Sequence, residues 1–241
     1  YLGGQFSYLA LRSLEYGALD DLFRHGRTRG MSGTFEAIEQ ATDWDHNAFL
    51  SAIGRQGASS NKKKKSLHWM LSNGCRVLDV GCGTGTFIEK LWRLYPRSSF
   101  VGVEPDQAAA RKAKAATGGM PVEVLHMRGE EMPFRNEFDL VYLGEALYAA
   151  DDKAAVVSNC HRALRKGGAI AVVEGLLPNL PSPLKEQEED LLIMGMQLDF
   201  ALQGYRFMTQ KEMAALLRGA GFGRIKFEDL GGSLFLVTAW K

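Results

Sequence analysis

The sequence predicts an α/β protein built on a seven-stranded, mostly parallel sheet with helices on both faces. From residue 76 onward, short apolar runs alternate with segments of helical periodicity. A glycine-rich turn, GCGTG at 81–85, directly follows the first apolar run. Two further apolar runs, separated by Gly231-Gly232, end the chain and predict an antiparallel hairpin. Strands that alternate with helices are typical of a parallel sheet covered on both sides.

The residues before the alternating region predict a helical cap. We expect a helix over 5–25, because its apolar residues recur at helical spacing on more than one side. Two short helices are predicted at 34–41 and 44–55. The lysine block at 61–65 is read as a solvated surface. Residues 1–66 are therefore predicted as a helical cap or dimerisation segment, and residues 67–241 as the main domain.

The main domain is predicted element by element. A short helix over 66–72 leads into it. Proline-rich residues 176–183 separate the alternating region from a long apolar helix over 184–203. Thr209 and Glu212 form a capping box that opens another helix. The remaining strands are predicted at 76–80, 99–104, 122–127, 138–143 and 169–176, and the helices between them at 85–95, 105–116 and 152–166.

Composition limits the classes of partner. The 241 residues include 29 basic and 28 acidic side chains, a net charge of +1, which argues against nucleic acid or a membrane surface as the main partner. No apolar run approaches the ~18 residues of a membrane span. The three cysteines form no CxxC pair, so neither a disulfide framework nor a zinc site is expected. We expect a cytoplasmic protein without a metal. Because the chain begins at Tyr1 rather than Met, we expect a longer protein.

The glycine turn predicts a nucleotide site. Its glycines, Gly81, Gly83 and Gly85, let the backbone approach a ligand at the start of a helix. Dinucleotide oxidoreductases and S-adenosylmethionine (SAM) methyltransferases both use such a turn. The third glycine of the dinucleotide fingerprint would fall on Thr86, which weakens that alternative. Glu104 ends the second strand, where a carboxylate accepts ribose hydroxyls in either class; the alternative is an exposed acid at a strand end.

Two later segments distinguish the classes. The turn and strand MRGEEMPFRNEFDLVYLGEAL (127–147) and the turn and strand LRKGGAIAVVE (164–174) follow the glycine turn and Glu104 in order. Together the four markers resemble class I SAM-dependent methyltransferases over residues 76–241. The resemblance implies a Rossmann-like fold and SAM as the cofactor.

The resemblance also implies where SAM lies. Asp79 and the glycine turn would hold its methionine part, with Cys82 packing in the turn rather than acting as a nucleophile. Arg128 departs from the family, which often has an acid there, so main-chain groups are expected to read the adenine. The full set of implied cofactor residues is Asp79, Gly81, Cys82, Gly83 and Gly85 at the methionine, Glu104 with Pro105 at the ribose, Arg128, Gly129 and Glu130 at the adenine, and Leu143 with Gly144 beneath the sulfonium.

A narrower resemblance concerns the second half of the chain. LGEALYAADDKAAVVSNCHRALRKGGAIAVVEGLLPN (143–179) and GYRFMTQKEMAALLRGAGF (204–222) are similar to the plant-type and bacterial small-molecule O-methyltransferases. That family carries a winged-helix dimerisation domain before this point. The resemblance implies a homodimer and a small-molecule acceptor.

The same family predicts two catalytic positions, one of them altered. Tyr148 stands where the family has its histidine base, and Glu174 matches one of the two acids that brace this histidine. The other acid would fall near Phe207 and is not kept. A phenol, with a pKa of ~10, is a poor base. Tyr148 is therefore either a replacement or a pocket wall, and Glu174 is either catalytic or a buried structural acid.

The histidines offer no clear substitute for the missing base. His25 and His46 lie in the predicted cap and are able to reach the pocket, as the cap does in this family. His126 ends the third strand near the expected adenine, and His161 is expected on the outer face of its helix. His68 precedes the sheet.

The acceptor itself is predicted only by class. The apolar helix over 184–203, with Phe207 after it, forms either a pocket wall or ordinary core; as a wall it would suit an aromatic acceptor. Oxygen is the first expected methyl acceptor, with carbon, nitrogen and sulfur open. The alternatives are a SAM-binding relative with other chemistry, such as hydroxylation or decarboxylation, a SAM-binding subunit without catalysis, and a dinucleotide dehydrogenase.

Overall fold

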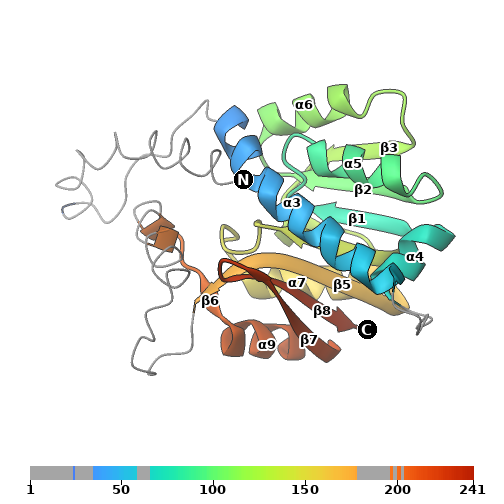
Figure 1. The fold of residues 1–241 in the computed structure, drawn as a ribbon. Helices are drawn as coiled ribbons and strands as arrows, with labels where there is room; N and C mark the ends of the chain where they lie inside the picture. Colours follow the sequence, from blue (N-terminus) through green and yellow to red (C-terminus); the bar gives the residue numbers. More distant parts are fainter. Residues whose placement is uncertain (1–23, 25–34, 59–65, 178–195, 198–199, 202–203) are drawn as a thin grey trace.

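A computed structural model describes Arg24 and residues 35–58, 66–177, 196–197, 200–201 and 204–241, the last residue being the end of the chain. These residues form the predicted sheet, with strand order β3-β2-β1-β4-β5-β8-β7 (Figure 1). All neighbours pair in parallel except β8, which is antiparallel to both β5 and β7. The strands are β1 Arg76–Val80, β2 Ser99–Glu104, β3 Val122–His126, β4 Phe138–Gly144, β5 Leu164–Leu177, β7 Gly223–Gly231 and β8 Leu234–Trp240, and a two-residue β6, Met208–Thr209, pairs with the end of β5.

Two helical layers cover the sheet, one on each face. Successive side chains along a strand point to opposite faces, so one strand contributes to both cores. Leu78 and Val141 pack into one core, whereas Val77 and Leu140 pack into the other. The first core is closed by α7 Lys153–Ala163 and α9 Gln210–Gly219. The second core is closed by α3 Phe35–Ala58, α4 Leu67–Asn73, α5 Thr86–Leu94 and α6 Gln107–Ala116 (Figure 1).

The N-terminal cap differs from the prediction. Residues 35–58 form one continuous helix, α3, rather than two short ones. Asp43 does not end a helix: its carboxylate pairs with Lys90 of α5 and accepts a hydrogen bond from Asn47, one turn later in α3. Phe49 and Ile53 of the same helix are fully buried in the core below. Tertiary packing therefore keeps this polar segment helical, although its sequence had suggested a break between two helices.

Most other predicted boundaries agree with the structure. Helix α7 ends at Ala163, three residues earlier than predicted, because β5 already begins at Leu164, which pairs with Phe138. The capping box is confirmed, since Thr209 caps α9 and Glu212 bonds back to it. The helices predicted over 5–25 and 184–203 and the lysine block fall outside the described residues, apart from Arg24, Met196, Gln197, Phe200 and Ala201. The domain boundary at residue 66 stays a prediction.

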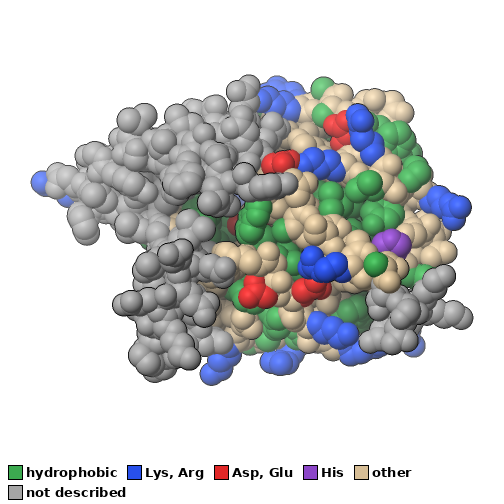
Figure 2. Space-filling model, viewed as in Figure 1, with side chains coloured by type: hydrophobic (Ala, Val, Ile, Leu, Met, Phe, Trp, Pro, Cys, Tyr) green, Lys and Arg blue, Asp and Glu red, His purple; other side chains and the backbone are tan. Residues whose placement is uncertain are grey.

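The surface agrees with the near-neutral composition. On the coloured part of the face in Figure 2, basic side chains are dispersed, with acidic ones among them. In the described parts of the chain, no helix is both long enough and apolar enough to cross a membrane.

We expect Gly102→Ala to destabilise the protein. Gly102 lies in β2 beneath the glycine turn, and a Cβ there would come within 2.7 Å of the Cys82 sulfur and 2.9 Å of Ile88 Cδ1. Overpacking of this kind costs about 1–3 kcal/mol. Urea unfolding should show that loss. The matched control is Gly219→Ala at the end of α9, where a Cβ meets nothing within 4 Å; it should be neutral or stabilising by up to about 1 kcal/mol. Equal stability of the two variants would contradict the packing.

Candidate active site

The turn between β1 and α5 forms an open cradle at the carboxyl edge of the sheet. Gly81, Gly83 and Gly85 have φ values of 81°, 54° and 83°, a left-handed conformation that favours glycine. A Cβ on Gly81 would lie 2.6 Å from that of Ala146, so the turn packs tightly against the segment after β4. A Cβ on Gly83 would meet nothing within 4 Å. The turn is therefore closed on its protein side and open above Gly83, as a ligand requires.

Glu104, at the end of β2, supports this turn. One carboxylate oxygen accepts the N–H of Gly83 at 2.9 Å, and the other accepts the N–H of Asp106 at 2.9 Å. The side chain is buried, and burial raises its pKa. The neighbouring carbonyl of Pro105 is 3.0 Å from Nε2 of His126. The structure thus brings Glu104, Pro105 and the turn together, as the sequence predicted.

Asp79 is the second acid beside the turn. It lies in β1 with 3% of its surface exposed. Burial, and then the charge of Glu104, raises its pKa to about 8. The two carboxylates are thus desolvated and repel one another, and a cationic ligand would relieve both effects.

The predicted adenine side is built from the turn after β3. Arg128 pairs with Asp151 at 2.5 Å and with Glu130 at 3.5 Å, so its guanidinium is held toward the segment before α7. Asn159 of α7 donates to the carbonyls of Gly129 and Glu130. A Cβ on Gly129 would lie 3.2 Å from Val80 and Val156. These contacts fix Arg128, Gly129 and Glu130 close to the end of β1.

The ends of β4 and β5 form the other side of the site. Glu174 of β5 is 1% exposed, and its Oε1 accepts the N–H of Tyr148 at 2.7 Å. Its Oε2 is buried without a hydrogen-bond partner. Burial, and then the charge of Glu145, raises the pKa of Glu174 to about 8. Leu143 and Gly144 end β4, adjacent to Val172 and Val173 of β5. A buried proton-binding group therefore lies next to Tyr148, across β4 from the glycine turn.

An aromatic cluster adjoins Tyr148. The Tyr148 ring stacks on Phe200 with centroids 4.4 Å apart, and it meets Phe207 and Tyr205 edge-on at 5.8 and 5.9 Å. Phe207, at the position near which the related family places an acid, is fully buried. The cluster is thus an apolar wall beside Glu174.

Comparison with known proteins identifies the family. The family model described as a methyltransferase domain matches residues 78–172, which include Asp79, the glycine turn, Glu104 and the end of β4. The chain belongs to the class I SAM-dependent methyltransferases. Its cofactor is accordingly SAM.

Individual relatives agree with this family. The ubiquinone biosynthesis O-methyltransferase of Rhodopseudomonas palustris (strain HaA2) is 31% identical over 173 residues, which cover 70% of this chain and 66% of that one. Over the first curated relatives, however, the chain spans only 38% to 56% of their length. The activity of the whole protein is therefore a matter for proposal.

Solved structures show the same fold. A protein of Nostoc punctiforme PCC 73102, provisionally described as an O-methyltransferase, superposes with a TM-score of 0.70 at 17% identity over 100% of this chain and 72% of that one. Human N-acetylserotonin methyltransferase, solved in complex with SAM, gives a TM-score of 0.62 at 23% identity over 94% of this chain and 66% of that one.

The residues of this methyltransferase fit SAM. The cradle above Gly83 offers open backbone, Glu104 offers carboxylate oxygens for ribose hydroxyls, and the buried Asp79 favours a cation. Methionine-side contacts by Cys82, and contacts by Arg128 to the adenine, stay predictions. Cys82 is buried, and burial raises the pKa of its thiol, which suits packing rather than nucleophilic chemistry. Among the described residues, no group of His, Cys, Asp and Glu is arranged to hold a metal.

Three residues at the site were not foreseen from the sequence. Asp45 of α3 and Tyr142 of β4 are buried, and Glu145 directly follows β4. Burial, and then the charge of Glu145, raises the pKa of Asp45, so the two acids are close enough for their charges to interact. Glu145 could have been suspected from its position after an apolar strand. Asp45 could not, because only the packing of α3 brings it to this edge.

The described histidines have other contacts. His46 stacks on Phe87 at 4.6 Å, and burial lowers its pKa to about 4. His161, expected on an outer face, instead packs edge-on against Phe222, which follows α9. His68 is 3.3 Å from Oγ of Ser72. None of these contacts involves Glu174 or Tyr148; His25 lies outside the described residues.

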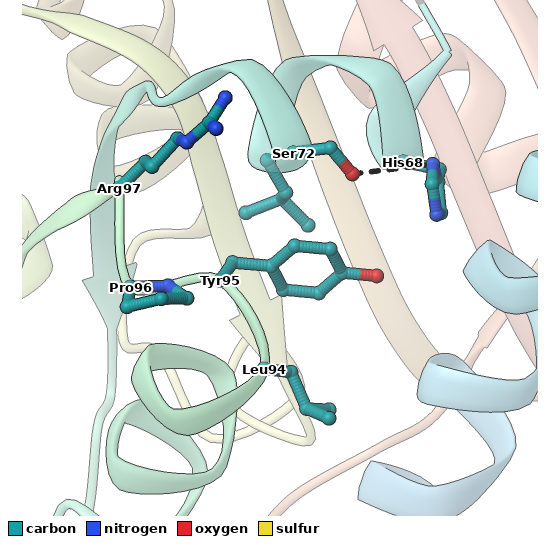
Figure 3. A pocket seen from close by; sticks show the side chains of 7 residues that line it. His68, Ser72, Leu94, Tyr95, Pro96 and Arg97 are labelled. Atoms are coloured by element: carbon teal, nitrogen blue, oxygen red, sulfur yellow. Dashed lines mark hydrogen bonds between the residues drawn. The ribbon is translucent and has the colours of Figure 1, made fainter.

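A separate pocket of about 430 Å³ opens at the opposite edge (Figure 3). Ser72 precedes β1, and Pro96 and Arg97 precede β2, so the pocket lies at the amino ends of the strands. Open α/β sheets bind their ligands at the carboxyl ends. This pocket therefore takes no part in the SAM site. Its lining residues are His68, Leu71, Ser72, Leu94, Tyr95, Pro96 and Arg97.

We expect Glu104→Gln to weaken SAM binding by about 10- to 100-fold, because a hydrogen bond to a charged group contributes about 1.5–3 kcal/mol. Isothermal titration with SAM measures this change. Glu123→Gln is the control, since Glu123 is exposed on the neighbouring strand β3. Unchanged affinity in Glu104→Gln would remove Glu104 from the SAM site.

The ligand-free protein should lose stability as pH rises. Folded Glu174 keeps its proton up to a pH of about 8, whereas an ordinary glutamate in the unfolded chain releases it near 4.5. The free energy of unfolding should therefore fall between these values, by about 1.4 kcal/mol for each unit of pKa shift. Glu174→Gln removes this contribution and should flatten the fall, though Asp79 still contributes. Urea unfolding from pH 5 to pH 8 tests this; parallel pH profiles of both proteins would contradict it.

Proposed function

We propose that this protein transfers the methyl group of SAM to a small acceptor with an apolar or aromatic body. The observation that carries the proposal is Glu174, a buried carboxyl group with one unpartnered oxygen, which binds the backbone of Tyr148, a member of the aromatic cluster. The family supports methyl transfer, and the resemblance to small-molecule O-methyltransferases supports a small acceptor.

The chain contributes position and proton control. When bound, SAM supplies an electrophilic methyl group, which leaves its sulfur as the acceptor's lone pair forms the new bond. Glu174 would take the proton that the acceptor loses once the positive charge of bound SAM favours its ionised form, and its raised pKa makes that carboxylate a stronger base than an ordinary one. The backbone N–H of Tyr148 orients this carboxyl group. The Tyr148 ring and Phe200 would hold an aromatic acceptor and keep water away from it.

Tyr148 supports this division of roles. Its carbonyl accepts a hydrogen bond from the Lys153 ammonium at 2.7 Å, so its backbone is held from both sides. Its ring packs within the aromatic cluster. We therefore propose that the side chain shapes the acceptor site and that Glu174, rather than the phenol, handles the proton.

A second function is favoured by one feature, the tyrosine at the family's histidine position. A SAM-binding relative that uses SAM for other chemistry would also lack that histidine. SAM with a labelled methyl group, incubated with extract from the protein's own source, separates the two. Label in an apolar small molecule supports methyl transfer. A product without label, formed only in the presence of SAM, supports the second function.

The proposed homodimer is tested by the mass of the full-length protein in solution.

Glu174→Gln should lower kcat for the acceptor so identified by about 10²- to 10⁴-fold, the usual contribution of a general base. SAM affinity should change less than twofold, since the glycine turn and Glu104 are untouched. Tyr148→Phe keeps the ring and the backbone N–H, so its loss in kcat should stay much smaller. A larger loss in Tyr148→Phe than in Glu174→Gln would assign the proton to the phenol instead.

A further inference from the structure

We propose that the methyl acceptor carries a basic nitrogen, which the carboxylates of Asp45, Glu145 and Glu174 bind as an ammonium group. This inference rests on the proposed function and adds the chemical class of the acceptor. It arises from Glu145, which follows β4, lies beside Glu174 of β5 and has a charge that also acts on Asp45 of α3.

The structure fixes these acids close to one another. The N–H of Glu145 donates to the carbonyl of Val173 at 2.8 Å, and its Oε1 accepts the N–H of Gly175 at 2.8 Å. Glu145 therefore lies directly beside Glu174 on the neighbouring strand. Its φ of 48° is left-handed, an unusual conformation for glutamate that these two bonds hold in place. Asp45 of α3 is 8% exposed and is close enough to Glu145 for their charges to interact.

A neighbouring polar group independently indicates a ligand. The hydroxyl of Tyr142 is buried without a hydrogen-bond partner, and the residue is only 2% exposed. It lies at the carboxyl edge, because a Cβ on Gly144 would be 2.4 Å from it. The charges of Asp79, Asp45 and Glu145 all act on this phenol. A buried hydroxyl left unpaired costs free energy, so its position among carboxylates fits a site completed by a bound polar molecule.

Among the described residues, acidic side chains outnumber the basic ones around the site. Asp79 and Glu104 lie at the glycine turn, and Glu145, Glu174 and Asp45 lie beyond it. Lys153 of α7 acts on Glu174, but its ammonium donates to the carbonyls of Tyr148 and Ala150. SAM brings one net positive charge, and the buried Asp79 favours a cation at the glycine turn. The other three acids have raised pKa values, and a bound ammonium group would favour the ionised form of each.

The excess of acidic side chains distinguishes among classes of methyl acceptor. A single carboxylate suffices as the base for a hydroxyl group, and a phenolate would make the ionised forms of these acids still less favourable. An ammonium group is attracted to them and forms charge-assisted hydrogen bonds with them. Burial raises the pKa of Glu145 to about 7, and burial together with the charge of Glu145 raises that of Glu174 to about 8, so the ionised form of either can accept the ammonium proton. The neutral amine then has the lone pair that bonds to the methyl carbon, as the electron pair of the carbon–sulfur bond stays on sulfur.

The test measures binding rather than turnover. The full chain, saturated with S-adenosylhomocysteine, is titrated calorimetrically with two matched pairs, tryptamine against tryptophol and phenethylamine against phenethyl alcohol. At pH 7.5 we expect the amine of a pair to bind at least about tenfold more tightly, because its hydrogen bonds are charge-assisted. Glu145→Gln and Asp45→Asn should each reduce this preference severalfold, while the affinity for the alcohol changes little. Glu123→Gln, exposed on β3, should keep the full preference.

The outcomes separate this inference from the proposed function. Binding of SAM with label transferred to an alcohol or phenol, and equal or weaker binding of the amines, would overturn the inference and leave methyl transfer standing. A preference for amines that survives both substitutions, or no saturable binding of either amine, would also overturn it. Failure to bind SAM would instead overturn the proposed function. Two separate variants are used so that a folding defect in one does not decide the result.

Discussion

The burial of carboxyl groups along one edge of the sheet is the constraint on which the site depends. Strands β2, β1, β4 and β5 are neighbours in the sheet in that order, and each has an acid in or just after its carboxyl end. Desolvation raises the pKa values of these acids, and their proximity adds repulsion. Such an edge is unfavourable when empty and becomes favourable when a cation is bound. The same feature that lowers the stability of the ligand-free protein therefore provides its affinity for a positively charged cofactor.

Close packing gives this edge its shape. The glycine turn approaches the segment after β4 at Gly81 and Ala146, and Cys82 lies on Gly102 of β2. Glu104 holds the turn through the N–H of Gly83. Because a methyl group at Gly81 or Gly102 would already clash, the position of the turn is set by contacts to β2 and to the segment after β4 rather than by its own flexibility.

The sequence predicted the sheet well, because apolar runs and the glycine turn are local signals. The same signals located Asp79 and Glu104, which end or nearly end strands. They did not locate Tyr142, which is beside Asp79 only because β4 pairs with β1. Asp45 was missed for a similar reason, since α3 reaches this edge through its packing on the core. Asp43 looked like a break between helices because its partner Lys90 lies 47 residues further along the chain. What escaped prediction was in each case a pairing between distant segments.

The anchoring of Glu174 has a consequence for how this enzyme could change over time. Tyr148 holds the Glu174 carboxyl group through its backbone N–H, whereas its side chain faces the aromatic cluster. Any residue except proline supplies that N–H. The side chain at 148 can therefore be exchanged without releasing the Glu174 carboxyl group. In the proposed function, substrate range and proton handling thus depend on different atoms of one residue, so one can diverge among descendants while the other is retained.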